Sequence, residues 1–436
     1  MANPFLIRDI RAGASGSQPQ HLTAFNNGIA FSAEDAYGNQ EPWFSDGTSS
    51  GTFKLSEINA GGASSPANFT PVGNQIFYTA SDGTTGRELW VSTANENSAT
   101  RVSDLQLGSG SSLPRDLTAF KGKLYFTADT GDGRQLFSTD GVTVETHLEN
   151  LTLHSDSELT VFGNRLAFVA ESSRDGRALY KWNGRSQRGK KIYDSYPDDN
   201  RNHSTIDNLK VVGKKLFFTA STYELNTELY VTKGSNRTTR LVKDINSISG
   251  GSNPMDLTAV GPKLYFSADD GIHGRNLWRT TGKPKKTKMV SDIYVGGTAN
   301  VDHITNVNGV LYFAASSLNS SGNPIYRELW KHDPSSRSTA LVKDIHPTSS
   351  SIQYNETFTA ANGTLVFSAD NGTNGIELWK SDGTEQGTMI VDDLFPGATG
   401  SSPSDPVVSG DKVFFSANPG SGLGGQELYA ITIGEL

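Results

Sequence analysis

A hydrophobic sequence motif that recurs nine times is the feature that most limits how these 436 residues can fold. Each copy has an apolar residue, a pair that contains an aromatic residue, one further residue and an alanine, as in Leu365-Val366-Phe367-Ser368-Ala369. The copies follow one another at about 48 residues and cover nearly the whole chain. A period of this length predicts a repeat architecture in which each copy forms one supersecondary unit.

Two further positions recur with the same period as the motif, and each also gives nine repeats. An Asp-Ile pair or a relative of it ends each unit, as at Asp344-Ile345. About ten residues after the motif comes an aromatic residue. This position is aromatic in every unit and has an apolar neighbour, so we expect the side chain in the core between units. The alternative is that these aromatic side chains stack on sugars. Five of the six tryptophans occupy this position: Trp43, Trp90, Trp278, Trp330 and Trp379.

Each unit contains four short apolar or alternating segments that are separated by Gly, Asn and Asp. Segments of four to seven residues with turn signals every 8–12 residues are typical of all-β proteins. Four strands at a period of 40–50 residues match one propeller blade. The sequence therefore predicts one domain over residues 1–436, a single closed β-propeller of nine four-stranded blades, with an eight-bladed ring as the alternative.

The two ends of the chain fit a ring. Residues 4–10 form a lone fourth strand, and residues 427–433 form a third strand that lacks a successor. We expect these two segments to pair, so that the N-terminal strand completes the last blade and leaves no open sheet edge. An open solenoid would instead have polar capping units at both ends, and the sequence contains none.

Residues 377–384, Glu-Leu-Trp-Lys-Ser-Asp-Gly-Thr, resemble the ELWxxDGT repeat of many bacterial and cyanobacterial proteins. Residues 41–48 are similar, with Pro42 in place of the leucine. The resemblance covers essentially the whole chain and implies an exported or surface-associated protein, with no catalytic residue set. Within the motif, Asp382 and Gly383 are expected to form a structural turn, with the Asp bonded to its own backbone and the Gly at positive φ.

Composition narrows the classes of function. The net charge of −8 disfavours a nucleic acid partner, which needs a basic surface. The chain has no cysteine, which excludes thiolate metal sites and thiol nucleophiles. The sequence contains no run of 18 apolar residues, so no insertion into a membrane is predicted. The first ten residues show no signal peptide.

Long loops between the second and third strands are the predicted functional positions, because binding residues concentrate on loops over a rigid scaffold. The same face carries an insertion over residues 316–327. The candidate ligand-binding residues on these loops and on the irregular fifth unit are Asp270, His273, Asn371, Asn374, Asp198, Asp199 and His203. No cofactor is predicted; the acidic loop with Asp129 and Asp132 leaves calcium open as an alternative.

Nine near-equivalent units multiply weak contacts through avidity, whereas an enzyme needs one distinctive site. We therefore expect a non-enzymatic, extracellular or surface-associated module that contacts glycans or protein partners through its long-loop face, with an oligomer or assembly as a further option. The first alternative is a structural component of a larger assembly such as a virion, an injection apparatus or a surface layer. The second alternative is a propeller glycosidase or lyase, which would need convergent carboxylates at the centre of the ring.

Overall fold

The computed structural model describes residues 3–13, 15–148, 151–173, 176–196, 205–222, 225–248, 250–319, 321–420 and 425–436. The helices among these residues are three single 3-10 turns, η1 (Asn236–Thr238), η2 (Pro284–Lys286) and η3 (Ile433–Glu435), and no described helix is long and apolar enough to cross a bilayer. The chain divides into two compact units. Unit 1 comprises residues 1–146 and 351–436, and unit 2 comprises residues 147–350.

Unit 1 consists of antiparallel sheets in which successive strands along the chain are neighbours. Its sheets run β2-β3-β4-β5, β6-β7-β8-β9, β10-β11-β12-β13, β31-β32-β33-β34 and β35-β36-β37-β1. The strands are β1 (Phe5–Arg8), β2 (Gln20–Phe25), β3 (Gly28–Glu34), β4 (Gln40–Ser45), β5 (Thr52–Lys54), β6 (Ala67–Val72), β7 (Gln75–Ser81), β8 (Arg87–Ser92), β9 (Thr100–Arg101), β10 (Arg115–Phe120), β11 (Lys123–Asp129), β12 (Arg134–Thr139), β13 (Val144–His147), β31 (Thr359–Ala361), β32 (Thr364–Asp370), β33 (Ile376–Ser381), β34 (Met389–Ile390), β35 (Ser404–Ser409), β36 (Lys412–Ala417) and β37 (Glu427–Thr432).

Unit 2 repeats the same topology in β15-β16-β17-β18, with β14 also paired to β16, and in β19-β20-β21-β22, β23-β24-β25-β26 and β27-β28-β29-β30. The strands are β14 (Thr152–Leu153), β15 (Thr160–Phe162), β16 (Arg165–Ser172), β17 (Gly176–Trp182), β18 (Lys190–Tyr193), β19 (Ile206–Val212), β20 (Lys215–Thr222), β21 (Asn226–Thr232), β22 (Arg240–Leu241), β23 (Met255–Val260), β24 (Lys263–Asp269), β25 (Arg275–Thr280), β26 (Lys288–Met289), β27 (Asp302–Val307), β28 (Val310–Leu318), β29 (Pro324–Asp333) and β30 (Ser338–Lys343). The predicted all-β class of four-stranded antiparallel sheets is confirmed.

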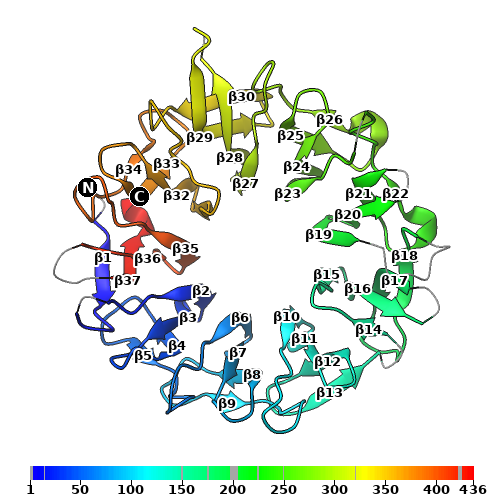
Figure 1. Ribbon diagram of the computed structural model, residues 1–436, viewed down its shortest axis with the longest axis vertical. Helices are drawn as coiled ribbons and strands as arrows, with labels where there is room; N and C mark the ends of the chain where they lie inside the picture. Colours follow the sequence, from blue (N-terminus) through cyan, green and yellow to red (C-terminus); the bar gives the residue numbers. More distant parts are fainter. Residues whose placement is uncertain are drawn as a thin grey trace. The chain divides into compact units, whose positions relative to one another are not determined.

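Within each unit the first strands of successive sheets lie along one common side. In unit 2 these are β15, β19, β23 and β27, and the fourth strands of the sheets lie on the opposite side (Figure 1). Between β23 and β27, Thr258 Oγ1 donates to the carbonyl of Ile304 at 2.7 Å and Asn306 Nδ2 donates to the carbonyl of Ala259 at 3.0 Å. The sheets are thereby joined at their first strands, which are referred to below as the inner strands.

The two aromatic positions of each repeat are direct cross-strand partners. Phe367 of β32 lies opposite Trp379 of β33, and Phe266 of β24 lies opposite Trp278 of β25. Trp278 is 5% exposed and packs in a cluster with Leu229 and Val231 of the preceding sheet. The second and third strands are buried on both faces because another sheet packs against each face, which explains their apolar runs without alternation.

A buried glutamate explains why Glu precedes Leu-Trp in most repeats. The Glu228 carboxylate of β21 is fully buried and accepts hydrogen bonds from the Ser252 backbone N–H at 2.7 Å and from Ser252 Oγ at 2.6 Å. Ile245, the second member of the Asp-Ile pair, also donates its N–H to Glu228 at 3.4 Å. This glutamate clamp ties the third strand to the segment that leads into the next inner strand. Similar contacts recur at Glu41, Glu88, Glu377 and Glu427, each of which accepts from a serine and from a backbone N–H at or next to the second member of the Asp-Ile pair.

The Asp-Gly-Thr turn has the local geometry that its residues favour. Asp382 Oδ1 accepts from the Thr384 N–H at 2.8 Å and from its hydroxyl at 2.7 Å. Gly383 has a φ of +89°, in the left-handed region, and its N–H bonds to Ser381 Oγ at 3.0 Å. These residues therefore build the connection between β33 and β34.

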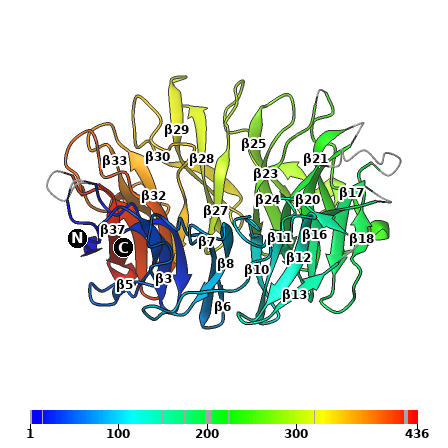
Figure 2. The ribbon, with the colours of Figure 1, turned by 60° about the horizontal axis from the view of Figure 1, so that its bottom comes forward.

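Three details differ from or refine the sequence-based expectation. β1 pairs with β37, as expected for the two ends of the chain. The fourth strands β9, β22, β26 and β34 have only two residues, so the Asp-Ile pairs lie beyond them and serve the glutamate clamps. The insertion over residues 316–327 is in large part strand: it lengthens the hairpin of β28 and β29, the long pair of strands at the upper edge of Figure 2.

Candidate active site

A β-bulge at the same place in most inner strands presents one polar side chain per sheet. In β23 the register shifts between Met255 and Thr258, and Asp256 within this bulge has a φ of +54°. In β27 the shift lies between Asp302 and Thr305, and His303 has a φ of +56°. Asn, Asp and His enter the left-handed region more readily than most residues, which explains why the sequence places them here.

In the ordinary repeats this bulge residue has a structural role. Asn68 Nδ2 donates to Thr79 Oγ1 at 3.3 Å, and Asn208 Nδ2 donates to Thr219 Oγ1 at 3.2 Å. In β10 the direction is reversed, because Thr127 Oγ1 donates to Asp116 Oδ2 at 3.0 Å. The hydroxyl on the second strand therefore fixes the side chain of the inner strand.

The sheet that begins with β27 breaks this pattern. The residue opposite Asp302 on β28 is Ala314, which has no hydroxyl. His303 Nδ1 instead lies 2.8 Å from Asp302 Oδ1 and 2.9 Å from Arg327 Nη2, and Arg327 also forms an ion pair with Asp302. The Arg327 side chain is only 3% exposed. Three groups that carry or can gain charge thus meet at one point of the inner strand.

Asp256 of the neighbouring strand faces this group. Burial raises the pKa of Asp256 above its ordinary value, and the charge of Asp302 raises this pKa further, whereas His303, Arg275 and a hydrogen bond with Ser267 act in the opposite direction. Arg275 Nη1 donates to Ser267 Oγ at 3.1 Å. The balance leaves a carboxyl group that retains its proton to higher pH than an exposed aspartate.

Two carboxyl groups in unequal surroundings can divide the work of acid and base. Asp256 is half-buried and its pKa is raised by burial, while Asp302 is ion-paired to Arg327 and contacts His303. Such a pair can donate a proton to a leaving group from one side and accept a proton from a nucleophile on the other. In the part of the chain that the structure describes, no group of three or more His, Asp or Glu side chains is arranged to hold a metal ion.

The long-loop residues singled out from the sequence mostly bond within their own loops. Asp270 accepts from the His273 N–H at 2.8 Å and contacts His273 Nδ1 at 2.8 Å, and this contact raises the pKa of His273. Asn371 Oδ1 accepts from the Asn374 N–H at 2.9 Å, and Asn374 Nδ2 donates to Asp393 at 2.7 Å. Their role in ligand binding stays a prediction.

The other candidates are dispersed. Asp129 Oδ1 accepts from the Gly131 N–H at 2.9 Å, which is a turn bond, and Asp132 is exposed on the same loop. Asp198, Asp199 and His203 lie outside the described residues. Sequence reasoning missed Asp256, Asp302 and His303. The available signal was Asp302 before His303, together with Ala314 in the second strand at the position where most other repeats have Thr or Ser; the histidine alone is no signal, since His21 holds the same bulge in β2.

Comparisons with known proteins show similarity at the level of fold. No protein-family model matches the sequence, and no curated protein matches it. Similar solved structures include a puromycin hydrolase (14% identity, TM-score 0.41, 84% of this chain and 60% of that chain) and a Mycobacterium tuberculosis puromycin-hydrolyzing peptidase (11%, 0.43, 94% and 62%). Another is the β-propeller domain of the Trilobed protease from Pyrococcus furiosus (12%, 0.37, 75% and 97%). The chain spans about three fifths of the length of the first two, and the shared fold is propeller-like.

Two expectations from the sequence need correction here. The expectations of a chain that is not an enzyme and of a non-enzymatic binding or structural module are not matched by the similar structures, which are a puromycin hydrolase, a puromycin-hydrolyzing peptidase and prolyl endopeptidases; at 11–14% identity these structures show a likeness of fold alone. Both had assumed that near-equivalent repeats leave no distinctive site. The inner strand β27 shows why the assumption was unsafe, since one substituted bulge changes the chemistry of an entire sheet edge.

Proposed function

We propose that the chain is a polysaccharide-cleaving enzyme, a glycosidase or lyase, that uses Asp256 as acid and Asp302 as base. The observation that carries this proposal is the pair of carboxyl groups on adjacent inner strands, of which Asp256 has a pKa raised by burial and by the neighbouring charge of Asp302. Glycoside hydrolysis commonly uses two carboxyl groups with separate roles.

In the hydrolytic form of the reaction, Asp256 transfers its proton to the glycosidic oxygen as the bond between that oxygen and the sugar carbon breaks. Asp302 accepts a proton from a water molecule, whose oxygen forms the new bond to the same carbon. The ion pair with Arg327 and the contact with His303 position the Asp302 carboxylate. In the lyase form, Asp302 instead removes the proton from the sugar carbon beside a carboxylate, a C=C bond forms as the C–O bond to the glycosidic oxygen on the next carbon breaks, and Asp256 protonates that oxygen, so no water is added.

The proposal is tested on the purified chain with a panel of neutral and acidic polysaccharides, by reducing-end release and by the absorbance of unsaturated products. Asp256→Asn and Asp302→Asn are each expected to lower kcat by about 100-fold or more, in the range of general acid–base catalysis. Because the acid must be protonated, activity is expected to fall as the pH rises through the raised pKa of Asp256.

Asp116→Asn is the matched control. Asp116 occupies the equivalent bulge of β10, and the native Asn68 and Asn208 show that asparagine fits this backbone position and its bond to threonine. The control is expected to retain full activity. Absence of turnover on every polysaccharide, or full activity in Asp256→Asn, would refute the proposal.

We further infer that the sheets are blades of a single nine-bladed propeller, that pairing of β1 with β37 closes the ring, and that the chain belongs to the ELWxxDGT repeat class. The nine sequence repeats and the β1–β37 pairing support this count. An extracellular or surface location accords with the same resemblance. An electron-microscopy map at a resolution that separates blades counts them directly, and an eight-bladed ring would refute the inference.

A further inference from the structure

Unit 2 is basic although the whole chain is acidic. Residues 147–350 contain 27 Lys and Arg against 20 Asp and Glu, a net charge of +7, whereas the remaining residues contain 11 against 26, a net charge of −15. The overall value of −8 conceals this separation. A local excess of positive charge attracts anionic ligands even in a protein of negative net charge.

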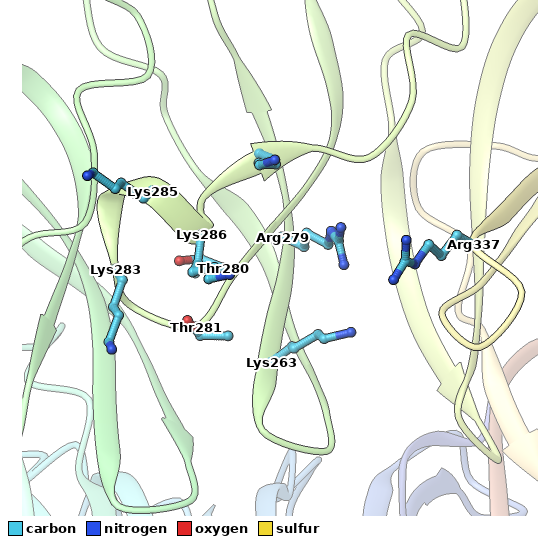
Figure 3. A pocket seen from close by; sticks show the side chains of 9 residues that line it. Lys263, Arg279, Thr280, Thr281, Lys283, Lys285, Lys286 and Arg337 are labelled. Atoms are coloured by element: carbon cyan, nitrogen blue, oxygen red, sulfur yellow. The ribbon is translucent and has the colours of Figure 1, made fainter.

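The excess is concentrated around a cavity at the end of the strands that lies away from the proposed active site. The cavity has a volume of about 440 Å³, seven of its nine lining residues are Lys or Arg, and the other two are threonines. Figure 3 shows Arg279 and Arg337 pointing toward each other from neighbouring sheets. Lys285 and Lys286 stand exposed on the η2 turn beside them. No carboxylate lines this cavity.

The same positions are cationic two sheets away. Arg279 of β25 pairs in register with Lys288 of β26, and Lys181 of β17 pairs in the same way with Lys190 of β18. Lys181 and Lys190 belong to a second cavity, of about 280 Å³, which again has no carboxylate in its lining. Equivalent registers in two sheets thus produce equivalent basic cavities.

The intervening sheet is hydrogen-bonded to both cavities: on the side of the smaller one, Lys181 Nζ donates to the carbonyl of Gly234 in this sheet. Lys215 Nζ donates to the carbonyl of Thr281 at 2.6 Å, and Arg240 Nη2 donates to the carbonyl of Gly282 at 2.7 Å. Thr281 lies in the wall of the larger cavity. These bonds hold the cations in place without cancelling their charge, because the acceptors are neutral carbonyl groups. The cations of the two cavities and of the intervening sheet, among them Lys181, Lys190, Lys215, Arg240, Arg279 and Lys288, are called the basic strip below. The basic strip extends across three consecutive sheets of unit 2.

The positive charge of the strip is not neutralised within the described residues. None of the cations named above takes part in an ion pair among the described parts of the chain. Burial lowers the pKa of Lys215, and the neighbouring positive charges of Lys233, Arg240 and Lys283 lower it further. Crowding of like charges costs free energy in the absence of an anionic ligand, so the strip is prepared to bind one.

We propose that this strip of unit 2 binds an acidic polysaccharide, whose carboxylate or sulfate groups contact the three sheets in succession. Repetition of one cationic set per sheet suits a polymer that carries charge at regular intervals, since linked weak contacts add through avidity. That the polymer is also the substrate rests on the proposed function; the binding itself does not.

The cavities favour a polysaccharide over a nucleic acid. Proteins that bind single-stranded nucleic acid usually offer exposed aromatic side chains on which bases stack, and the larger cavity has no aromatic residue in its lining. In the smaller cavity the aromatic residue is Trp182, which is 2% exposed and donates Nε1–H to the carbonyl of Ser186 at 2.5 Å. The hydroxyl group of Thr281 beside the lysines suits a ligand with both charges and hydroxyls, whereas the Thr280 hydroxyl is buried and bonded to Thr287 and to the Gly282 N–H.

The test measures equilibrium binding of the full chain to dextran sulfate, polygalacturonate and neutral dextran at several salt concentrations. We expect binding to the two anionic polymers, weakening steeply as salt rises, and no binding to neutral dextran. The triple variant Lys263→Gln, Lys285→Gln, Lys286→Gln is expected to bind at least about tenfold more weakly and with a shallower salt dependence, since it removes three exposed ionic contacts.

Lys123→Gln is the matched control for Lys263→Gln. Both lysines are the first residue of a second strand, but Lys123 belongs to unit 1 and forms an ion pair with Glu145 at 3.0 Å. Lys123→Gln is expected to bind as the unmodified protein does, while Lys263→Gln binds more weakly. Asp256→Asn is expected to leave binding unchanged, so that failure of cleavage and failure of binding are separable.

Several results would overturn the proposal: no salt-sensitive binding to either anionic polymer, equal loss in the Lys123→Gln and Lys263→Gln proteins, or no loss in the triple variant. Tighter binding to duplex or single-stranded DNA than to both polysaccharides would assign the strip to nucleic acid instead.

Discussion

Glu228 is the residue at which the stability of a repeat can be tested most directly. Its carboxylate is fully buried and accepts two short bonds from Ser252 and a longer one from the Ile245 N–H. Glu228→Ala removes all three acceptor contacts and leaves the donors buried. A buried donor without its partner costs about 1–3 kcal/mol, so we expect the variant to lose about 3–5 kcal/mol, a large part of the stability of an ordinary domain.

Glu228→Gln should cost much less. The amide keeps the volume and one carbonyl acceptor, and it avoids the cost of a buried charge. The chain already contains this solution at Asn276, whose Oδ1 accepts from the Ile293 N–H at 3.2 Å in the equivalent contact. We therefore expect a loss of about 1 kcal/mol, the net contribution of one hydrogen bond, and a similar loss for Ser252→Ala.

The sign of the pH effect gives an independent check. Burial raises the pKa of Glu228 above 4.5, its ordinary value, so the folded state binds a proton that the unfolded state has released. Stability of the unmodified protein therefore increases as the pH falls from the raised pKa toward 4.5 and gains nothing further from this group below it. Glu228→Gln lacks this increase.

Urea unfolding at neutral and mildly acidic pH measures both effects, with Glu228→Gln and Ser252→Ala as the conservative companions. If Glu228→Ala costs less than about 1 kcal/mol, or if Glu228→Gln shows the same pH dependence as the unmodified protein, then the glutamate clamp does not stabilise the sheets in the way argued here.

Three further predictions follow from other contacts. The melting temperature should rise as the pH falls from 8 toward 5, because burial raises the pKa of the clamp residues Glu41, Glu88, Glu377 and Glu427 as it does that of Glu228. A flat calorimetric profile would contradict this. Gly383→Ala should cost about 1 kcal/mol in urea unfolding, because its φ of +89° is strained for alanine, while Gly434→Ala, which meets open space, should cost little. Asp270→Asn should lower the pKa of His273 in an NMR titration, since their contact raises it; an unchanged pKa would disprove the link.

The strands were predictable from the sequence because each repeat packs in the same way and therefore needs the same residue types at the same positions. A second strand buried on both faces tolerates only apolar and small residues, so Leu365, Phe367 and Ala369 carry the same signal as their counterparts in the other repeats. The partner position of Phe367 is Trp379, and their spacing follows from the length of the connecting loop. The length of the fourth strand was less predictable, because the Asp-Ile pair recurs as regularly as a strand signal, yet the N–H of its Ile bonds to a glutamate of another strand.

The proposed pair of Asp256 and Asp302 could not be read from the sequence because its members are separated along the chain. Asp256 and Asp302 are 46 positions apart, and what brings them together is the lateral contact of β23 with β27. The unusual character of Asp256 comes from burial, which sequence spacing does not report. The candidates at the loop tips, such as Asp270 and Asn371, were easier to notice, but their polar atoms are largely engaged in turns.

The repeat also dictates where a function can arise. Residues in the middle of the second and third strands touch neighbouring sheets on both faces, so a polar substitution there would cost burial without reaching a ligand. The inner-strand bulge and the opposite ends of the strands are the positions at which unit 2 carries its unusual groups: His303 contacts Asp302 and Arg327, and Lys263, Arg279 and Lys288 line one cavity that has no carboxylate in its wall. A repeat protein can thus gain chemistry at one strand end and a binding surface at the other without disturbing the packing between them.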